Sequence, residues 1–287
     1  MSNDRTDFAA IRAKAQLKDA SDPNAKFGAD FRSIKEEVSA AEWKARCDLA
    51  ACYRLVDIYG MSDLTYNHIT VRIPGTEHLL INLYGLLYKE VTASSLVKID
   101  VEGNVIWKPD TDYGINVAGY IIHGAIHGAR PDVGSVIHTH TRAGMAVAAT
   151  KGGLLPLTQH AMRFKGHIGY HDYEGPATSL DERKRMVANL GRHNAMILRS
   201  HGLVTCGPTI PEAFNLLYQL EMSCRAQVDI MAGGTENLLL PPDDVVEGTA
   251  KIFAPGAIRP YGILEWPAML RRVEADCKGS PYAHYAS

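Results

Sequence analysis

The chain has 287 residues, of which 46% are hydrophobic and 22% charged, with 30 Lys and Arg against 32 Asp and Glu. This composition is typical of a globular domain with a substantial core, and it excludes disorder of the whole chain. A net charge of −2 without clusters of Lys and Arg argues against nucleic acid or an anionic membrane as partners. The first residues lack an apolar leader and no stretch approaches a span of about 20 apolar residues, so we expect neither secretion nor membrane insertion.

The first half of the chain predicts an arm, one helix and several hairpins. Residues 1–38 are polar and weakly periodic, which is typical of a terminal arm. From the capping pattern of Ser39 and Glu42 to Gly60, apolar residues recur at helical spacing. Strand-like runs follow at 68–72, 79–82, 96–99 and 105–107. Such closely spaced runs indicate antiparallel pairing.

The second half of the chain alternates helices with strands. The predicted helices cover 114–129, 141–150, 181–190 and 209–231, and the predicted strands cover 133–138 and 195–198. Five prolines beyond residue 236 predict an extended tail rather than a second core. We therefore predict a single α/β domain at 39–235, flanked by an N-terminal arm at 1–38 and an extended C-terminal tail at 236–287.

Three histidines stand where predicted strands end. His138 and His140 are two positions apart, so they project from the same face of one strand, and His201 follows another short apolar strand beside a glycine. Three imidazoles with a free fourth position are the ligands of a catalytic site of the zinc type. Spacing alone also fits ordinary buried histidines that form hydrogen bonds within a core.

Two further histidines share a helix face. His123 and His127 are four positions apart on the predicted helix at 114–129. They can support the metal ligands or contact the substrate, or they can form a polar face that packs against a neighbouring subunit. Helical spacing fixes only their common direction, so both interpretations stay open.

The cysteines indicate a reducing compartment. The chain has five of them, in neither a CxxC pair nor an even disulfide framework: Cys47, Cys52, Cys206, Cys224 and Cys277. We therefore expect a cytoplasmic protein.

Several stretches together resemble the class II aldolase/adducin family, and most closely its adducin-like branch. They are SDLTYNHIT (62–70), GLLYKEVTASSLVK (85–98), RPD (130–132), HTH (138–140) and RSHGL (199–203). The resemblance covers residues 40–235. It implies an α/β/α sandwich around a mostly antiparallel sheet, a four-fold symmetric homotetramer, and a divalent metal on His138, His140 and His201. Zinc is the metal expected first, with manganese, iron or cobalt as alternatives.

The same resemblance shows where this chain departs from the sugar-phosphate aldolases. The position of their catalytic glutamate is Gly119 here, which removes a general base whose loss costs on the order of 10²–10⁴ in rate. The family's phosphate-binding serines fall near Val117 and Ala118, and its threonine before the glycine falls at Tyr84. Asn67 and Gly85 do match pocket positions. With Tyr84 they form the expected substrate-binding set, for a substrate without phosphate.

Two functions follow from these matches and departures. The first is a metal-dependent carbon–carbon lyase, acting by retro-aldol cleavage or decarboxylation on a small carbonyl or hydroxy-acid substrate. Tyr173 lies near the position of the family's catalytic tyrosine and is the expected proton donor, with His123 and His171 as alternatives. The second is a non-enzymatic, adducin-like assembly module with a structural or vestigial metal site. Adducins engage actin through a long Lys-rich tail, whereas the last ten residues here carry a single lysine. Actin binding is therefore not expected.

Overall fold

The computed structural model describes residues 15, 18–19, 21–175, 180–254 and 256–287. One eight-stranded sheet runs through this part of the chain, in the order β4-β3-β2-β1-β5-β8-β7-β6. All neighbouring strands are antiparallel except β6 and β7, which are parallel. The strands are β1 (His68–Arg72), β2 (Leu79–Ile81), β3 (Val97–Ile99), β4 (Val105–Trp107), β5 (Ser135–Thr139), β6 (Ile168–His171), β7 (Ala195–Leu198) and β8 (Gly202–Gly207).

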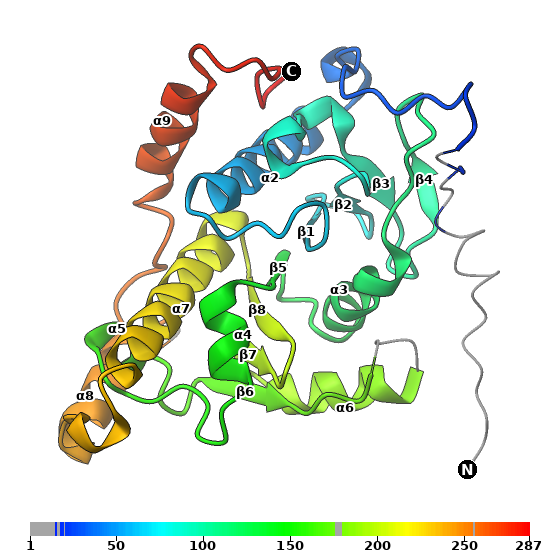
Figure 1. Ribbon diagram of the computed structural model, residues 1–287. Helices are drawn as coiled ribbons and strands as arrows, with labels where there is room; N and C mark the ends of the chain where they lie inside the picture. The colour runs from blue at the N-terminus through cyan, green and yellow to red at the C-terminus, as the bar shows by residue number, and fades with distance from the viewer. Residues whose placement is uncertain (1–14, 16–17, 20, 176–179, 255) are drawn as a thin grey trace.

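Helices cover both faces of this sheet. The helices of the described residues are α2 (Ala40–Ile58), α3 (Val117–Ala129), α4 (Arg142–Ala148), α5 (Gln159–Met162), α6 (Leu180–Leu190), α7 (Ile210–Met231), α8 (Asp243–Phe253) and α9 (Trp266–Cys277). Short 3₁₀ helices lie at Lys35–Glu37, Tyr88–Glu90, Ala93–Ser95 and Thr235–Asn237. Figure 1 shows α2 and α7 on one side of the sheet and α3 and α6 on the other. The expected α/β/α sandwich around a mostly antiparallel sheet is confirmed.

The two-residue period of the strands divides the core between the layers. In β7, Met196 and Leu198 pack in the cluster that includes α3 and α6, whereas Ala195 and Ile197 pack in the cluster that includes α4 and α7. By the same alternation, His138 shares the face of Val136, which packs in the α3 and α6 cluster. The histidine pair at the end of β5 therefore leaves the sheet on the side of α3.

The first helix begins as the sequence predicted but with one different contact. The Ser39 hydroxyl accepts a hydrogen bond from the backbone N–H of Glu42 (3.1 Å). The Glu42 carboxylate does not accept a hydrogen bond from the backbone N–H of Ser39, as a capping box would require. It accepts from the buried Arg46 (3.0 Å) and from Lys98 of β3 (2.7 Å). The residue thus ties α2 to the sheet.

The C-terminal segment is not the extended tail that its prolines suggested. It contains α8 and α9, with Pro242 at the N-cap of α8 and a proline in the first turn of α9. Proline suits both places, because it has no N–H to leave unsatisfied and its φ fits a helix start. Trp266 and Val273 of α9 are buried in the main core. The prediction that this segment is extended was wrong, and the domain limits at 39 and 235 stay a prediction.

The arm at 1–38 lies mostly outside the described residues up to position 20. Beyond it, the Lys26 ammonium pairs with Asp110 (2.9 Å), and the buried Ile34 donates its N–H to Ser94 (3.3 Å). This part of the arm packs on the body of the domain.

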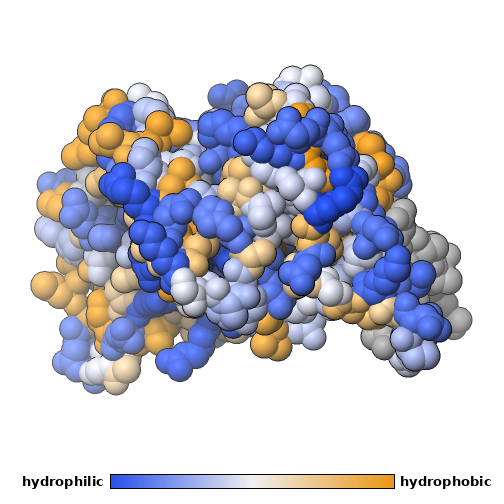
Figure 2. Space-filling model, turned by 90° about the horizontal axis from the view of Figure 1, so that it is seen from above, coloured by the Kyte–Doolittle hydropathy of each residue, from blue (hydrophilic) through white to orange (hydrophobic). Residues whose placement is uncertain are grey.

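The surface of the described residues is mixed. Seen from above, hydrophilic side chains cover most of the face, with apolar groups between them (Figure 2). All five cysteines are free thiols. Among the described helices, none combines the length and the apolar character that crossing a bilayer needs.

Candidate metal centre

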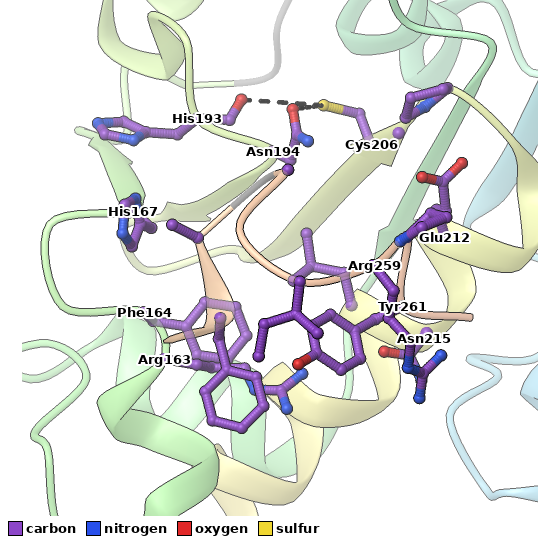
Figure 3. Close-up of a pocket in the computed structure, with 18 of the residues that line it drawn as sticks. Arg163, Phe164, His167, His193, Asn194, Cys206, Glu212, Asn215, Arg259 and Tyr261 are labelled. Atoms are coloured by element: carbon purple, nitrogen blue, oxygen red, sulfur yellow. Dashed lines mark hydrogen bonds between the residues drawn. The ribbon is translucent and has the colours of Figure 1, made fainter. Parts of the chain in front are cut away.

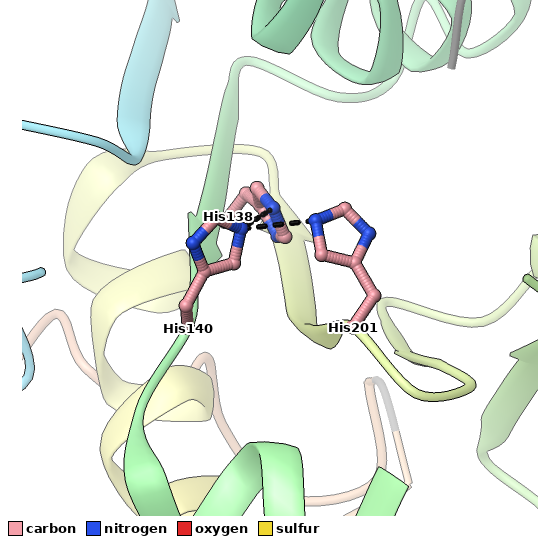
Figure 4. Close-up of side chains that lie close together, drawn as sticks. All are labelled: His138, His140 and His201. Carbon is pink, nitrogen blue, oxygen red and sulfur yellow. Dashed lines mark hydrogen bonds between the residues drawn. The ribbon is translucent and has the colours of Figure 1, made fainter. Parts of the chain in front are cut away.

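Three strand ends bring His138, His140 and His201 together. His138 lies in β5, His140 follows that strand directly, and His201 lies in the turn between β7 and β8. Because β5 pairs antiparallel with β8, the end of β5 lies beside the start of β8. The Nε2 atom of His140 is 2.9 Å from Nε2 of His138 and 2.9 Å from Nε2 of His201 (Figure 4).

The outer nitrogens of two of these rings are already committed. His138 Nδ1 lies 2.9 Å from the carbonyl oxygen of Leu203, and His140 Nδ1 lies 3.1 Å from Oδ2 of Asp63. Both partners only accept, so each Nδ1 carries the proton. When both rings carry only this proton, the two Nε2 atoms hold lone pairs that face each other across 2.9 Å. Such an arrangement is repulsive alone and favourable around a cation, so the donor set fits a divalent metal.

Burial keeps these rings in the form that binds metal. It lowers the pKa of His138 well below its usual value, with the neighbouring His201 and His140 adding to the effect. It also lowers the pKa of His201 to about 4, again with a contribution from His140. Both rings are therefore neutral at neutral pH, which leaves their lone pairs free for a metal.

Unusual backbone conformations border the centre. Among the described non-glycine residues, those with positive φ are Leu64 (48°), Asn67 (72°) and Ser200 (54°). Leu64 directly follows Asp63, Asn67 directly precedes His68, and Ser200 directly precedes His201. Strain of this kind is held by the surrounding structure, usually at functional sites. Gly202 is required too, because a Cβ there would lie 2.3 Å from the Thr139 carbonyl oxygen, as expected for a glycine that allows close backbone approach.

His68 occupies the space that Gly119 leaves open. A Cβ on Gly119 would lie 1.5 Å from Nε2 of His68. His68 is also the direct cross-strand partner of His138, so the two side chains leave the sheet on the same face. Burial lowers the pKa of His68 to about 4, with His140 contributing. A neutral imidazole thus lies where the resemblance would place the side chain of a glutamate.

His123 and His127 form a buried pair behind His68. His123 Nδ1 and His127 Nε2 each lie 2.8 Å from the hydroxyl of Thr70. The rings of His123 and His68 are 5.7 Å apart, centre to centre. Burial lowers the pKa of His123 well below its usual value. The pair is therefore buried inside the subunit, next to His68. It does not form a surface face that could pack against a neighbouring subunit.

The structure places Tyr173 at the centre and His171 beside it. The Tyr173 ring lies 6.2 Å from that of His201 and is 56% exposed. His171 is buried, and its Nδ1 accepts from the Asn189 amide (2.9 Å) while Nε2 lies 3.8 Å from Glu182. Both residues line a small cavity with His201. Tyr173 is the more accessible of the two to a ligand.

The expected substrate-binding residues differ in how far their polar groups are already engaged within the protein. Asn67 is 1% exposed, and neither atom of its side-chain amide has a hydrogen-bond partner within the described structure. Tyr84 is half-buried and donates its N–H to the Gly114 carbonyl (2.8 Å). Gly85 has φ of 116° and packs against Tyr113. Of these three residues, Asn67 is the one that directly precedes a histidine of the site, His68.

Three residues of this site escaped the sequence analysis: Asp63, His68 and Thr70. Asp63 is 77 positions from His140, so no local spacing connects them. All three lie in the stretch SDLTYNHIT, in which only Asn67 was singled out. The only signal was the density of polar residues leading into a buried strand.

Replacing Asp63 with asparagine is expected to weaken metal binding by about 10- to 100-fold. Asparagine keeps the size of the side chain but removes the charge that fixes the His140 tautomer. The measurement is metal affinity by competition with a chromophoric chelator. Asp276→Asn is the control, because Asp276 is an exposed carboxylate of α9 that pairs with Arg272 of the same helix. Equal affinity of wild type and Asp63→Asn would contradict the role of Asp63.

Comparison with known proteins agrees with this architecture. Residues 47–228 match the model of the class II aldolase and adducin N-terminal domain. The chain is 47% identical over 248 residues to a Caulobacter vibrioides protein whose name places it with the class 2 aldolases, covering 86% of this chain and 95% of that one. It is also 47% identical over 199 residues to α-adducin of Rattus norvegicus, covering 68% of this chain but 27% of the adducin. The chain therefore belongs to the class II aldolase and adducin family, as the resemblance in its sequence indicated.

Solved structures show the same fold. An aldolase II superfamily protein from Pseudomonas syringae superposes with a TM-score of 0.84 at 42% identity, covering 89% of this chain and all of that one. L-fuculose 1-phosphate aldolase from Glaciozyma antarctica PI12 superposes with a TM-score of 0.73 at 26% identity, covering 88% and 96%. The similarity thus extends to a named aldolase.

Proposed function

We propose that this protein is a metal-dependent carbon–carbon lyase that cleaves a small, non-phosphorylated carbonyl or hydroxy-acid substrate by retro-aldol reaction or decarboxylation. The observation that carries the proposal is the convergence of the Nε2 atoms of His138, His140 and His201, a group to which the described residues add no fourth His, Cys, Asp or Glu ligand. Zinc suits three imidazoles best, and manganese, iron or cobalt are alternatives. When bound, the metal polarises a substrate oxygen and stabilises the negative charge that develops as the bond breaks.

The chain's own residues divide the remaining tasks. Leu203 and Asp63 hold the His138 and His140 rings in the ligating tautomer. The free amide of Asn67 can donate to one substrate oxygen and accept from a hydroxyl. Tyr173 is the proposed proton donor to the carbon that keeps the electron pair of the broken bond, and its ring lies 6.2 Å from that of His201. His123 and His171 are held more deeply, so we rank them behind Tyr173 as proton donors.

His68 is the residue that we add to this set. Its neutral imidazole fills the space at Gly119 and stands beside His138, so it can take a proton from a substrate hydroxyl in place of the missing carboxylate. The choice of a substrate without phosphate rests on Val117 and Ala118, whose side chains lie outside the described part of the structure. Asn67 supports it, because a neutral amide does not balance a dianion. Tyr84 and Gly85 complete the proposed substrate pocket.

The proposal includes self-assembly. Family resemblance suggests a homotetramer, with a small-molecule substrate as the other partner. Tyr173 lies near His201 of its own chain, so the proton donor need not come from a neighbouring subunit. Size-exclusion chromatography with light scattering measures the state directly.

The second candidate is an adducin-like assembly module without catalysis. It is favoured by the 47% identity to rat α-adducin over 199 residues. In that case the metal is structural, and its fourth position is closed by protein. Among the described residues, the group of possible ligands has three members, which favours the lyase.

Metal analysis of the purified protein, followed by a screen for aldolase and decarboxylase activity, tests the proposal. We expect close to one divalent ion per chain in the wild type, and loss of both metal and activity in His138→Ala. His160→Ala is the matched control, because His160 is an exposed histidine of α5. A wild-type protein that binds no divalent metal would refute the proposal. Metal without lyase activity across the screen would favour the assembly module.

A further inference from the structure

A second cavity lies at the other end of the β7 and β8 hairpin. It has a volume of about 450 Å³ and is bounded by residues before β7, residues after β8, and the segment that follows α8 (Figure 3). His193 and Asn194 precede β7, and Gly207 ends β8. His201 lies in the turn at the opposite end, about 13 Å away along a four-residue strand. The cavity is therefore separate from the metal centre.

The cavity wall is rich in positive charge. Three arginines line it, Arg163, Arg192 and Arg259, with Glu212 as its acidic side chain. The Glu212 carboxylate already accepts a hydrogen bond from the Thr209 hydroxyl (2.7 Å). Arg259 pairs with Glu265, which does not line the cavity. For Arg163 and Arg192, the described residues provide no carboxylate within ion-pair distance.

Arg163 is held in place without being neutralised. Its guanidinium stacks on the ring of Phe253 (4.2 Å) and lies 5.8 Å from that of Tyr261. Its Nε is buried and has no hydrogen-bond partner in the described structure. Stacking on aromatic faces leaves the edge of the guanidinium free for two parallel hydrogen bonds to an oxyanion. A fixed, half-buried and unpaired arginine is thus prepared for a carboxylate or phosphate group.

Other lining residues define the rest of the ligand. His167 and His193 add two imidazoles, and the pKa of His193 is lowered by burial, by His167 and by Arg130. Phe164 and Leu216 add apolar wall. A wall of this kind favours a ligand with an apolar body and an anionic head, and the volume suits a small molecule.

We propose that this cavity is a binding site for a small organic oxyanion, whose carboxylate or phosphate head is held by Arg163 and whose apolar body lies against Phe164 and Leu216. The site lies outside the metal centre and does not depend on the lyase proposal. Because β7 and β8 run from one site to the other, a ligand here contacts the hairpin that carries His201.

Isothermal titration calorimetry at fixed ionic strength tests the site with four probes: inorganic phosphate, phenyl phosphate, benzoate and benzyl alcohol. We expect phenyl phosphate or benzoate to bind with Kd on the order of 1 mM or tighter, inorganic phosphate to bind more weakly, and neutral benzyl alcohol not to bind. Comparing phenyl phosphate with benzoate distinguishes a phosphate head from a carboxylate head. If no anion binds at concentrations of about 10 mM, the proposal is wrong.

Variants locate the binding. Arg163→Ala is expected to weaken it at least about tenfold, and Arg163→Lys to weaken it less, because lysine keeps the charge but loses the paired hydrogen bonds. Arg192→Ala removes an exposed cavity arginine without disturbing the core, so it tests the site even if Arg163→Ala folds poorly. Arg271→Ala removes a charge from the exposed side of α9 and is the matched control. Binding that survives in Arg163→Ala and Arg192→Ala but is lost in His138→Ala would assign the anion to the metal centre and overturn the proposal.

Discussion

Replacing Gly119 with alanine is expected to destabilise the protein by about 1–3 kcal/mol, although alanine is the better helix former. The new methyl group would overlap Nε2 of His68 at 1.5 Å. His68 is buried in β1, so either its ring or α3 must move. The free energy of unfolding from urea denaturation measures this effect.

The double variant gives the sharper result. In a His68→Ala background the obstacle is absent, and Gly119→Ala should become neutral or stabilising by up to about 1 kcal/mol. Gly128→Ala on the same helix is the matched control. A Cβ there would meet only Val101 at 3.5 Å, an ordinary contact. If Gly119→Ala has the same effect with and without His68, the two residues do not share the space that we assign to them.

Replacing His127 with glutamine is expected to change how stability depends on pH. Burial and the nearby Arg72 lower the pKa of His127 to about 3 in the folded protein, against 6.5 for an ordinary histidine. Between these values the unfolded chain binds a proton that the folded chain does not. Stability therefore falls as pH decreases below 6.5, by up to about 1.4 kcal/mol for each pH unit. Glutamine does not titrate, and its amide can still bond to Thr70.

The measurement is the free energy of unfolding at pH 7.5 and at pH 5. We expect the difference between wild type and His127→Gln to shift by about 2 kcal/mol in favour of the variant at the lower pH. Parallel profiles for wild type and His127→Gln would mean that folding does not lower the pKa of His127.

The sequence was sufficient to predict the parts of the site that depend on local periodicity. His138 and His140 share a strand face because side chains alternate, and His201 follows a recognisable buried strand. His68 could not be predicted in this way. Its role depends on how β1 packs against α3, two elements far apart in the chain. In the sequence, Gly119 indicates only that the glutamate is missing, and not that its space is taken by another side chain. Asp63 was missed for the same reason.

The elements of the fold that have a local apolar pattern could be predicted in the same way. The strands at 68–72 and 195–198 and the long helix from 209 were predicted from their apolar pattern, and the structure contains them. Strand β8 was missed, because GLVTCG lies directly after a turn and its Leu203 and Val204 are adjacent, so it shows no two-residue alternation. The helices α8 and α9 were missed because a proline breaks most helices and is favourable only where a helix starts, which is where both of these prolines lie. Their stability comes from packing, as for the buried Trp266, which no local pattern encodes.

The wide spacing of the metal centre along the chain has a consequence for folding. His140 is 61 positions from His201 and 77 from Asp63, so the centre cannot form from any one local segment. Its contacts have high contact order, and they close only when strands from both halves of the sheet have paired. An ion held by these histidines would tie two long loops at one point, restricting the open chain in the manner of a cross-link. The centre would then form late in folding and afterwards slow the separation of the two halves of the sheet.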